Sequence, residues 1–364
     1  MRIEDLTDRL AGSAWTLERV LPRDAEHALV QLRDGSGTSV AGQWFADPGR
    51  ARRVAAQTAD GAGAGLVEQP FTDLVVQRAG TDRRLRGLAD RCSAAGAKLR
   101  AHRPERRAGV EIHEGGGSRF VKVVRPERLG SAQVRAMTLR VPGVPTPRVL
   151  DVDLAAGTVT TAALTGSTLH EAIADPDLGE QMVEVGRTLA HLHAAPLPDE
   201  VARHGPEAEI AVVDRWWRLA EEYGAAAPRT AVTAARARLA ELLSRSSASN
   251  ALLHRDLHDK QVVLGNGGPG LLDLDLLAVG DPALDLANLV VHLELRARQG
   301  ALPPSRAIEL TEHLVAGYAP DPRTLAALPG YLLATRLRLV ALYAFRPASA
   351  AAAAELLTDP LIPA

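Results

Sequence analysis

The chain has 364 residues, 46% of them hydrophobic and 24% charged, with a formal net charge of -2 at pH 7. This length suits two or three units of domain size, and the near-neutral charge gives no electrostatic reason to expect nucleic acid or an anionic membrane. No apolar run approaches the ~18 residues of a membrane span, the N-terminus lacks a secretory signal, and a single cysteine, Cys92, excludes an intramolecular disulfide. We expect a soluble, cytoplasmic protein without an obligate protein partner.

The first segment, residues 1–95, alternates strand-like and helix-like patterns. Strands are predicted at 15–20, 27–32 and 38–45, and helices at 49–59 and 82–94. Residues 78–107 are rich in arginine, and a solvated helix face explains them better than a nucleic-acid site does. We interpret the segment as an accessory α/β cap that forms no site of its own.

The second segment, residues 96–165, predicts a small sheet with one helix. Strands are expected at 98–102, 109–113, 119–124, 148–152 and 158–163, and the helix at 127–139. Gly115, Gly116 and Gly117 separate the second and third strands, and glycines there suit a hairpin loop that needs positive φ.

The third segment, residues 166–364, is predicted to be mostly helical. Amphipathic runs cover 178–194, 208–223, 230–243, 282–298, 306–318 and 325–345. Between the third and fourth runs, residues 252–264 place polar side chains between two apolar anchors, which is typical of a loop held at both ends. In the predicted strand 271–276, Asp273 and Asp275 alternate with leucines, so both carboxylates share one face and need a cation, donors or water.

The motifs that contain these polar residues resemble those of the aminoglycoside phosphotransferase family of the protein-kinase-like superfamily. The resemblance rests on His-x-Asp-x-His-x-x-Gln at 254–261, on Asp-x-Asp at 273–275 and on Gly-Asp-Pro-Ala-x-Asp-Leu-Ala at 280–287. Arg-Phe-Val-Lys-Val-Val at 119–124 is similar to a strand of that family's N-lobe. The resemblance implies an α+β, bilobal fold with a small β-sheet N-lobe and a mostly helical C-lobe.

The resemblance also implies a role for each matching residue. Asp256 would be the catalytic base, Asp273 the main Mg²⁺ ligand, and Lys122 the lysine that pairs with the phosphates of ATP. Gln261 stands where most members have a metal-binding asparagine, as it does in maltokinase-like relatives.

Further residues would support these roles. Gly116 and Gly117 would offer backbone amides to the nucleotide, Ala163 would lie at the adenine-binding hinge, and His254, His258 and Asp285 would support the loop. His254 would fix the loop by hydrogen bonding, Asp285 would accept backbone donors, and His258 could bond the backbone near Asp273. The glutamate that should pair with Lys122 is missing, and Gln133 stands in the aligned helix.

Three alternatives remain open at this point. Asp273-Leu-Asp275 also resembles the nucleophile motif of haloacid-dehalogenase-like phosphatases, although its position and its neighbours fit poorly. The missing glutamate would suit an inactive nucleotide-binding or scaffold protein. For an active kinase, the acceptor is open. Residues 199–222 have a net charge of -4, which favours a cationic acceptor such as an aminoglycoside or amino sugar. Gln261 and the cap instead favour a resemblance to kinases of neutral sugars or glucosamine. All kinase readings share a small-molecule hydroxyl acceptor.

Overall fold

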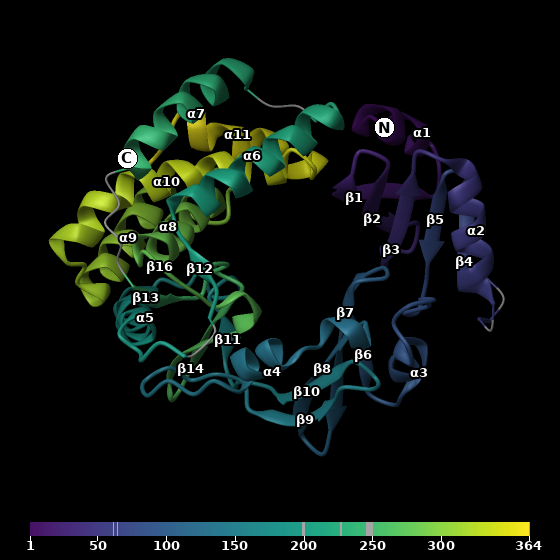
Figure 1. The fold of residues 1–364 in the computed structure, drawn as a ribbon, viewed down its shortest axis with the longest axis horizontal. Coiled ribbons are helices and arrows are strands. Elements are labelled where there is room, and N and C mark those ends of the chain that lie inside the picture. The colour runs from purple at the N-terminus through teal and green to yellow at the C-terminus, as the bar shows by residue number, and fades with distance from the viewer. Residues whose placement is uncertain (61, 64, 199–200, 226–227, 245–249, 364) are drawn as a thin grey trace.

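The computed structural model describes residues 1–60, 62–63, 65–198, 201–225, 228–244 and 250–363, and the side chains of 131–133 are not described. Three parts follow one another along the chain: a cap, an N-lobe and a helical C-lobe. Figure 1 shows them arranged in a ring, with the cap between the N-lobe and the end of the C-lobe where α6 and α10 lie. The predicted α+β class, with a small sheet followed by a helical lobe, is confirmed.

The first part of the chain contains a five-stranded antiparallel sheet and three helices, the last of which packs on the N-lobe sheet. Its strands run in the order β1-β2-β3-β5-β4: β1 Trp15–Asp24, β2 His27–Asp34, β3 Ser39–Phe45, β4 Val67–Phe71 and β5 Leu74–Gln77. The helices are α1 Ile3–Leu10, α2 Pro48–Ala59 and α3 Leu88–Ser93. The predicted helix 82–94 is shorter than expected because Asp82 accepts hydrogen bonds from the amides of Arg84 and Leu85 in a turn.

The cap packs directly on the C-lobe. The Val20 amide on edge strand β1 donates to the Phe345 carbonyl (2.9 Å), and the Tyr223 hydroxyl donates to the Asp24 carbonyl (2.7 Å). Trp44 contacts Tyr223 edge to face at 6.1 Å between ring centroids. Buried residues of the cap and of the C-lobe belong to one continuous apolar cluster, so the two parts share a core.

The N-lobe is a second antiparallel sheet, in the order β6-β7-β8-β10-β9. Its strands are β6 Ala97–Arg103, β7 Arg107–Glu114, β8 Gly117–Val124, β9 Val149–Asp153 and β10 Thr158–Ala162. The predicted helix 127–139 is divided into a single turn, η1 Pro126–Arg128, and α4 Ser131–Thr138. Gly130 lies between them, and glycine is unfavourable inside a helix.

The C-lobe contains seven helices among its described residues. They are α5 Leu178–His193, α6 Pro206–Glu222, α7 Arg229–Leu243, α8 Ala283–Arg298, α9 Pro304–Tyr318, α10 Pro322–Tyr343 and α11 Ala350–Thr358. By length and composition α10 could cross a membrane, but 61% of its apolar window is buried inside the protein, and it packs against α6, α7 and α8 as a core helix does.

Short strands position the polar loop on this helical lobe. They form two three-stranded sheets, β11-β14-β15 and β12-β16-β13. Their bounds are β11 Ser167–Thr168, β12 Arg203–His204, β13 Ala251–Leu253, β14 Val262–Gly265, β15 Gly268–Leu271 and β16 Ala278–Gly280. The chain between β13 and β14 is the loop that the sequence singled out, and both of its ends are paired strands.

Candidate active site

Asp285, in the first turn of α8, holds the start of the loop. Its fully buried carboxylate accepts hydrogen bonds from the amides of His254 (2.6 Å) and Arg255 (2.7 Å). Arg255 adopts a left-handed φ of +70°, an unfavourable conformation for this residue type, and Asn288 Nδ2 donates to its carbonyl (2.9 Å). The expected anchoring by Asp285 is therefore present in the geometry.

Two histidines extend this anchor. His254 is fully buried, and its Nε2 donates to the Leu272 carbonyl (2.8 Å), so the loop is tied to the segment that carries Asp273. His193 bonds both Asp285 (3.1 Å) and the Tyr318 hydroxyl (2.8 Å). Burial raises the pKa of Asp285, but the hydrogen bond and charge of His193 and the amides outweigh burial, so its net shift is downward and it stays ionised.

His258 does not make the hydrogen bond that the sequence suggested. Among the described residues its Nδ1 accepts from the Lys260 amide (3.1 Å), and its ring lies against His292 with centroids 5.0 Å apart. No bond joins it to the backbone near Asp273, because the ring turns toward α8. Burial lowers the pKa of His258, which favours the neutral imidazole.

Asp259 is a loop anchor that the sequence did not reveal. It is fully buried and accepts two hydrogen bonds from Arg296 on α8 (2.7 and 3.1 Å) and one from His170 Nδ1 (2.5 Å). Burial raises its pKa, and the Arg296 guanidinium more than reverses this, holding the pKa well below its usual range. No local spacing signals such a pair, because its members lie on separate elements.

Lys122, in the middle of β8, meets the acidic segment of the C-lobe. Its Nζ lies 3.2 Å from Asp273 Oδ1 and also contacts Asp275 Oδ2, and Arg107 Nη1 lies 3.8 Å from a carboxylate oxygen of each aspartate. These carboxylates are the lysine's partners in this structure. The side chain of Gln133, which stands in the position of the missing glutamate, lies outside the described residues.

The acidic segment is a turn and not the predicted strand 271–276. Strand β15 ends at Leu271, Asp273 has a left-handed φ of +54°, and a 3-10 turn, η2 Leu274–Leu276, follows. This turn directs both carboxylates toward Lys122. Burial alone would raise the pKa of Asp273. The charges of Lys122 and Arg107 lower it by more than burial raises it, so the net shift is downward. Asp275, to which the sequence assigned no role, is thereby part of the site.

The oxygen donors of this site fit a hard divalent cation. The backbone carbonyl of Gln261 accepts from the Leu272 amide (2.9 Å), which places Gln261 beside the segment of Asp273 and Asp275. Carboxylate and amide oxygens are the ligands that Mg²⁺ prefers. Within the described ranges no group of three or more acidic, histidine or cysteine side chains could enclose a metal alone. That suits an Mg²⁺ that one or two carboxylates share with the phosphates of a nucleotide.

Asp256 lies at the exposed side of the loop. It is half-buried, and no side-chain hydrogen bond or ion pair of its carboxylate occurs in the part of the chain that the structure describes. All its acidic neighbours in the site are paired, whereas this carboxylate keeps its lone pairs available. A hydroxyl bound beside it could therefore transfer its proton to Asp256.

The glycine hairpin and the hinge lie at one edge of the N-lobe sheet. Glu114 pairs with Gly117 across the β7–β8 hairpin, and Gly116 has a φ of +83°, so the predicted hairpin is confirmed. The Ala163 amide donates to the Ser118 carbonyl (3.1 Å), which ties the hinge to the hairpin. Residues 113–118 line a space of about 380 Å³.

Two described acids of the stretch 199–222 are held in ion pairs. Glu209 is buried, bonds His204 (2.8 Å) and lies 3.6 Å from Arg338. Asp214 pairs with Arg236 on α7 (2.6 Å). Asp199 and Glu200 lie outside the described residues. Two of the acids behind the expected negative surface are therefore compensated, whereas Glu221 and Glu222 are exposed without an ion pair among the described residues, so that expectation stays a prediction.

A sequence model of the phosphotransferase enzyme family matches residues 108–328, which is more than half of the chain. The chain belongs to this family. The matched region contains the loop at 254–261, Asp273 and Asp285. Its members include the aminoglycoside phosphotransferases of the protein-kinase-like superfamily, so the chain is a small-molecule kinase and the phosphatase alternative is excluded. No curated protein matches the sequence significantly.

Solved structures agree with this family at the level of the fold. The aminoglycoside phosphotransferase APH(3'')-Id from Streptomyces rimosus is 22% identical, with a TM-score of 0.51 over 68% of this chain and 94% of that one. APH(4)-Ia is 16% identical, with a TM-score of 0.55 over 75% and 95%. The amicoumacin kinase hAmiN is 16% identical, with a TM-score of 0.52 over 74% and 90%.

Proposed function

We propose that this phosphotransferase moves the γ-phosphoryl group of ATP, bound with Mg²⁺, to a hydroxyl group on a sugar-like ring. The observation that carries the proposal is the juxtaposition of Lys122, Asp273 and Asp275 with an unpaired Asp256. Structural relatives support it: a thermostable mutant of APH(4)-Ia binds ADP and hygromycin B, and hAmiN binds AMP-PNP, Ca²⁺ and its antibiotic.

In this proposal each residue performs one part of the transfer. Lys122 releases the aspartates and neutralises phosphate oxygens, and Asp273, Asp275 and Gln261 hold Mg²⁺, which supplies charge neutralisation to the nucleotide when bound. Asp256 orients the acceptor hydroxyl and takes its proton. The hydroxyl oxygen bonds to the γ-phosphorus, the bond to the bridging oxygen breaks, and ADP leaves. The buried anchors Asp285 and His254 keep the loop in position.

Titration calorimetry with AMP-PNP tests the nucleotide site. We expect Mg²⁺-dependent binding by the native chain and a loss of that dependence in Asp273→Ala, because the main carboxylate ligand of a hard cation is removed. Asp214→Ala, which removes an exposed carboxylate on α6, is the matched control and should bind like the native chain. Equal Mg²⁺ dependence in Asp273→Ala would remove this residue from the proposed role.

An ADP-release assay with sugars, amino sugars, aminoglycosides and nucleosides tests the acceptor class. We expect release that depends on a sugar-like hydroxyl compound. Transfer only to serine or threonine of a protein would contradict the small-molecule acceptor. Nucleotide binding without transfer to any hydroxyl compound would favour the inactive-protein alternative.

A further inference from the structure

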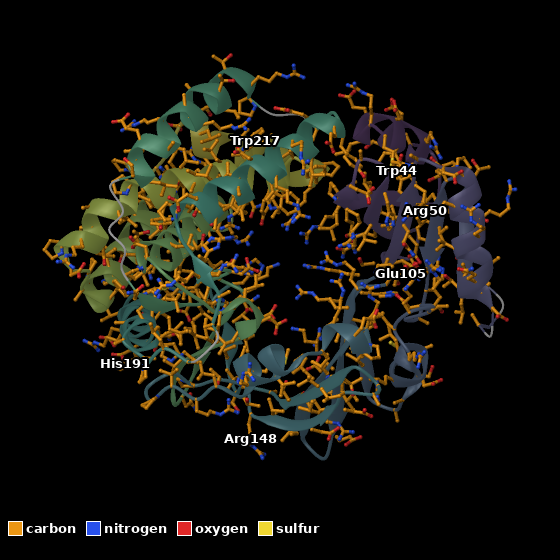
Figure 2. All side chains as sticks on the ribbon, in the orientation of Figure 1. Trp44, Arg50, Glu105, Arg148, His191 and Trp217 are labelled. Atoms are coloured by element: carbon orange, nitrogen blue, oxygen red, sulfur yellow. The ribbon has the colours of Figure 1, made fainter. Side chains whose placement is uncertain are left out.

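Arginine side chains from all three parts of the chain lie around the catalytic centre. Arg19 lies on β1 of the cap, Arg103 ends β6 of the N-lobe, Arg106 follows in the β6–β7 turn, and Arg346 follows α10 of the C-lobe. Figure 2 shows many side chains tipped with nitrogen in the space that the three parts surround. Arg103 and Arg106 belong to the arginine-rich stretch 78–107, and Arg19 belongs to the segment in which the sequence suggested no site.

Backbone contacts fix this convergence. The hydrogen bond between the Val20 amide and the Phe345 carbonyl (2.9 Å) joins the residues next to Arg19 and Arg346. Arg103 faces Arg107 across the β6–β7 hairpin, and Arg107 lies 3.8 Å from Asp273. The arginines of the cap, the N-lobe and the C-lobe are thus held beside the site by the fold itself and not by flexible tails.

These arginines lack acidic partners. Within the residues described, no carboxylate lies at ion-pair distance from Arg19, Arg103 or Arg346, and the buried Nε atoms of Arg19 and Arg346 have no hydrogen-bond partner. Burial and the neighbouring arginines lower the pKa of Arg19 to about 9 and that of Arg103 to about 10. Both values are well above neutral pH, so the guanidinium groups stay charged, repel one another and require an anion for compensation.

The nucleotide does not supply that anion for the whole cluster. In the proposed function its phosphates would lie with Lys122, Arg107 and Mg²⁺ on the Asp273 side of the site. Arg19 and Arg346 belong instead to the cap and to the end of α10. The carboxylate that acts on Arg19 is that of Asp256, the residue that meets the acceptor.

A cavity with room for an anionic group adjoins Arg346, one member of the cluster. Arg346 and Lys260 line a cavity of about 430 Å³ together with Arg296, Arg298 and Tyr343. The volume is within the range of about 300–1,000 Å³ that is usual for small-molecule sites. The residues that line this cavity include four cations and no acid. Arg296 is paired with Asp259, and Arg298 with Glu355 and Asp359. Arg346 lies over the Tyr343 ring (4.0 Å), and among the described residues neither Arg346 nor Lys260 has a carboxylate at ion-pair distance.

We propose that the acceptor carries a phosphate or carboxylate group besides its reacting hydroxyl, and that Arg19, Arg103 and Arg346 bind this group. The inference rests on the proposed function, because it concerns the acceptor of the same reaction. Guanidinium groups bind either anion with two parallel hydrogen bonds. Bound in this way, the acceptor's charge would no longer repel Asp256 and the incoming γ-phosphate, so its hydroxyl could approach both.

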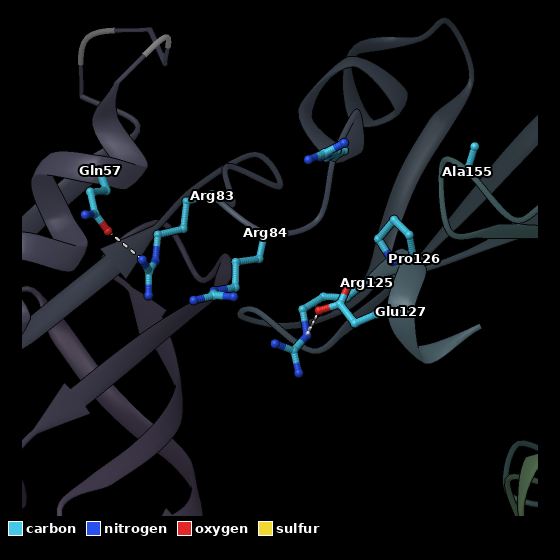
Figure 3. A pocket seen from close by; sticks show the side chains of 8 residues that line it. Gln57, Arg83, Arg84, Arg125, Pro126, Glu127 and Ala155 are labelled. Atoms are coloured by element: carbon cyan, nitrogen blue, oxygen red, sulfur yellow. Dashed lines mark hydrogen bonds and ion pairs between the residues drawn. The ribbon is translucent and has the colours of Figure 1, made fainter. Parts of the chain in front are cut away.

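A second arginine-rich cavity does not carry this role. It has a volume of about 610 Å³ and lies between the cap and the N-lobe (Figure 3). Three of the four arginines that line it are paired: Arg83 with Glu105 (2.7 Å) and Gln57 (2.5 Å), Arg84 with Glu105 (3.3 Å), and Arg125 with Glu127 (3.5 Å). The fourth, Arg86, is exposed to solvent. Asp256 and Asp273 are not among its lining residues. Because most of its arginines are paired and no catalytic group lines it, this cavity gives no reason to expect an anionic substrate there.

Calorimetry on the full chain saturated with AMP-PNP and Mg²⁺ tests the inference. The probes share a ring and differ in charge: glucose 6-phosphate, glucuronate, neutral glucose and cationic glucosamine. We expect binding of the phosphate probe, the carboxylate probe or both, at least about tenfold tighter than glucose or glucosamine. Arg19→Gln and Arg346→Gln should each weaken the affinity for the anionic probe about 10- to 100-fold, because each variant loses a charge-assisted hydrogen bond. Exposed Arg53→Gln on α2 is the matched control and should bind like the native chain.

Three outcomes would overturn the inference. The first is binding of glucose or glucosamine as tightly as of the anionic probes. The second is no binding of either anionic probe at millimolar concentration. The third is a loss of AMP-PNP affinity in Arg19→Gln as large as the loss of probe affinity, since the cluster would then serve the nucleotide. None of these outcomes removes AMP-PNP binding by the native chain, so the kinase proposal would survive them.

Discussion

The catalytic loop and the arginine cluster are neighbours, but the buried charges of the loop are paired and those of the cluster are not. Asp259 in the loop and Asp285, which anchors the loop from α8, are fully buried, and each is bonded by a histidine and at least one further donor. In the cluster, Arg19, Arg103 and Arg346 converge without a carboxylate partner in the part of the chain that the structure describes. Paired charges fix the position of reacting groups, whereas uncompensated charges are left for a ligand.

Asp256→Asn should have the largest effect, because Asp256 is the one described carboxylate of the loop that is not paired. Asparagine keeps the size of the side chain but cannot take the hydroxyl proton, so kcat should fall by about 10²- to 10⁴-fold. Single-turnover ADP release measures this, and AMP-PNP calorimetry should show unchanged nucleotide affinity. A normal kcat would show that the unpaired carboxylate is not the base.

Asp285→Asn tests whether paired charges position the loop. The amide would place a donor against the amides of His254 and Arg255 or against His193, so we expect the free energy of unfolding to fall by about 2–4 kcal/mol. Denaturant unfolding measures this loss. The kcat should fall as well, by about tenfold or more, with little change in nucleotide affinity. A destabilised variant with native kcat would break the link between pairing and positioning.

Acid should weaken the cap before it weakens the loop. Burial and Arg50 lower the pKa of His27 from about 6.5 in the unfolded chain to about 4, so protons bind the unfolded chain first as pH falls. Stability is therefore lost between pH 6.5 and 4, by about 3 kcal/mol for this group. Asp259 and Asp285 have lowered pKa values, so the stability that they contribute is lost only below pH 3.9, which is about the pKa of aspartate in the unfolded chain.

Thermal unfolding at pH 7 and pH 4.5 measures the difference. The variant His27→Gln removes this titration, so its stability relative to the native chain should rise on acidification. A native chain and a variant that respond equally to pH would show that His27 is protonated in the folded state without penalty.

The smallest expected effect has the opposite sign to the others. Arg19→Gln relieves repulsion between Arg19, Arg103 and Arg346, so the unliganded protein should melt about 1–3 °C higher than the native chain. Inorganic phosphate should raise the melting temperature of the native chain more than that of the variant. Arg53→Gln, which removes an exposed arginine of the cap, should change neither quantity. A lower melting temperature in Arg19→Gln would show that the arginine stabilises the junction.

The sequence predicted the parts of the site whose members are close together in the chain. The loop at 254–261 and the aspartates near 273 are separated by a fixed, short spacing, and the apolar residues that flank them mark strands. The main helices of the C-lobe were predicted within a few residues because their amphipathic patterns are long. Lys122 stood out as a lone charge in an apolar strand, and the structure places it against Asp273.

The parts that the sequence did not predict depend on distant contacts or on short patterns. The arginine cluster joins residues from both ends of the chain, so no local spacing describes it. Strand β5 has only four residues, and all are buried, so its sequence shows no alternation of apolar and polar residues from which a strand could be predicted. Helix α1 did carry a signal, since Ile3, Leu6 and Leu10 are buried on one face. The alternation of leucines with aspartates predicted a strand at 271–276. Such a pattern cannot indicate that Asp273 adopts a left-handed φ, and the structure has a turn there.

The cap's shared core with the C-lobe bears on how the enzyme can move. The chain connects the cap to β6, and Tyr223, Trp44 and the Val20–Phe345 hydrogen bond connect it to the C-lobe. The N-lobe is therefore attached to the C-lobe at two ends, through the hinge near Ala163 and through the cap. A wide opening of the two lobes would have to separate buried apolar surface or bend the cap sheet. We expect turnover to proceed with small lobe rotations, and product release to be slowed by any change that tightens the cap contact.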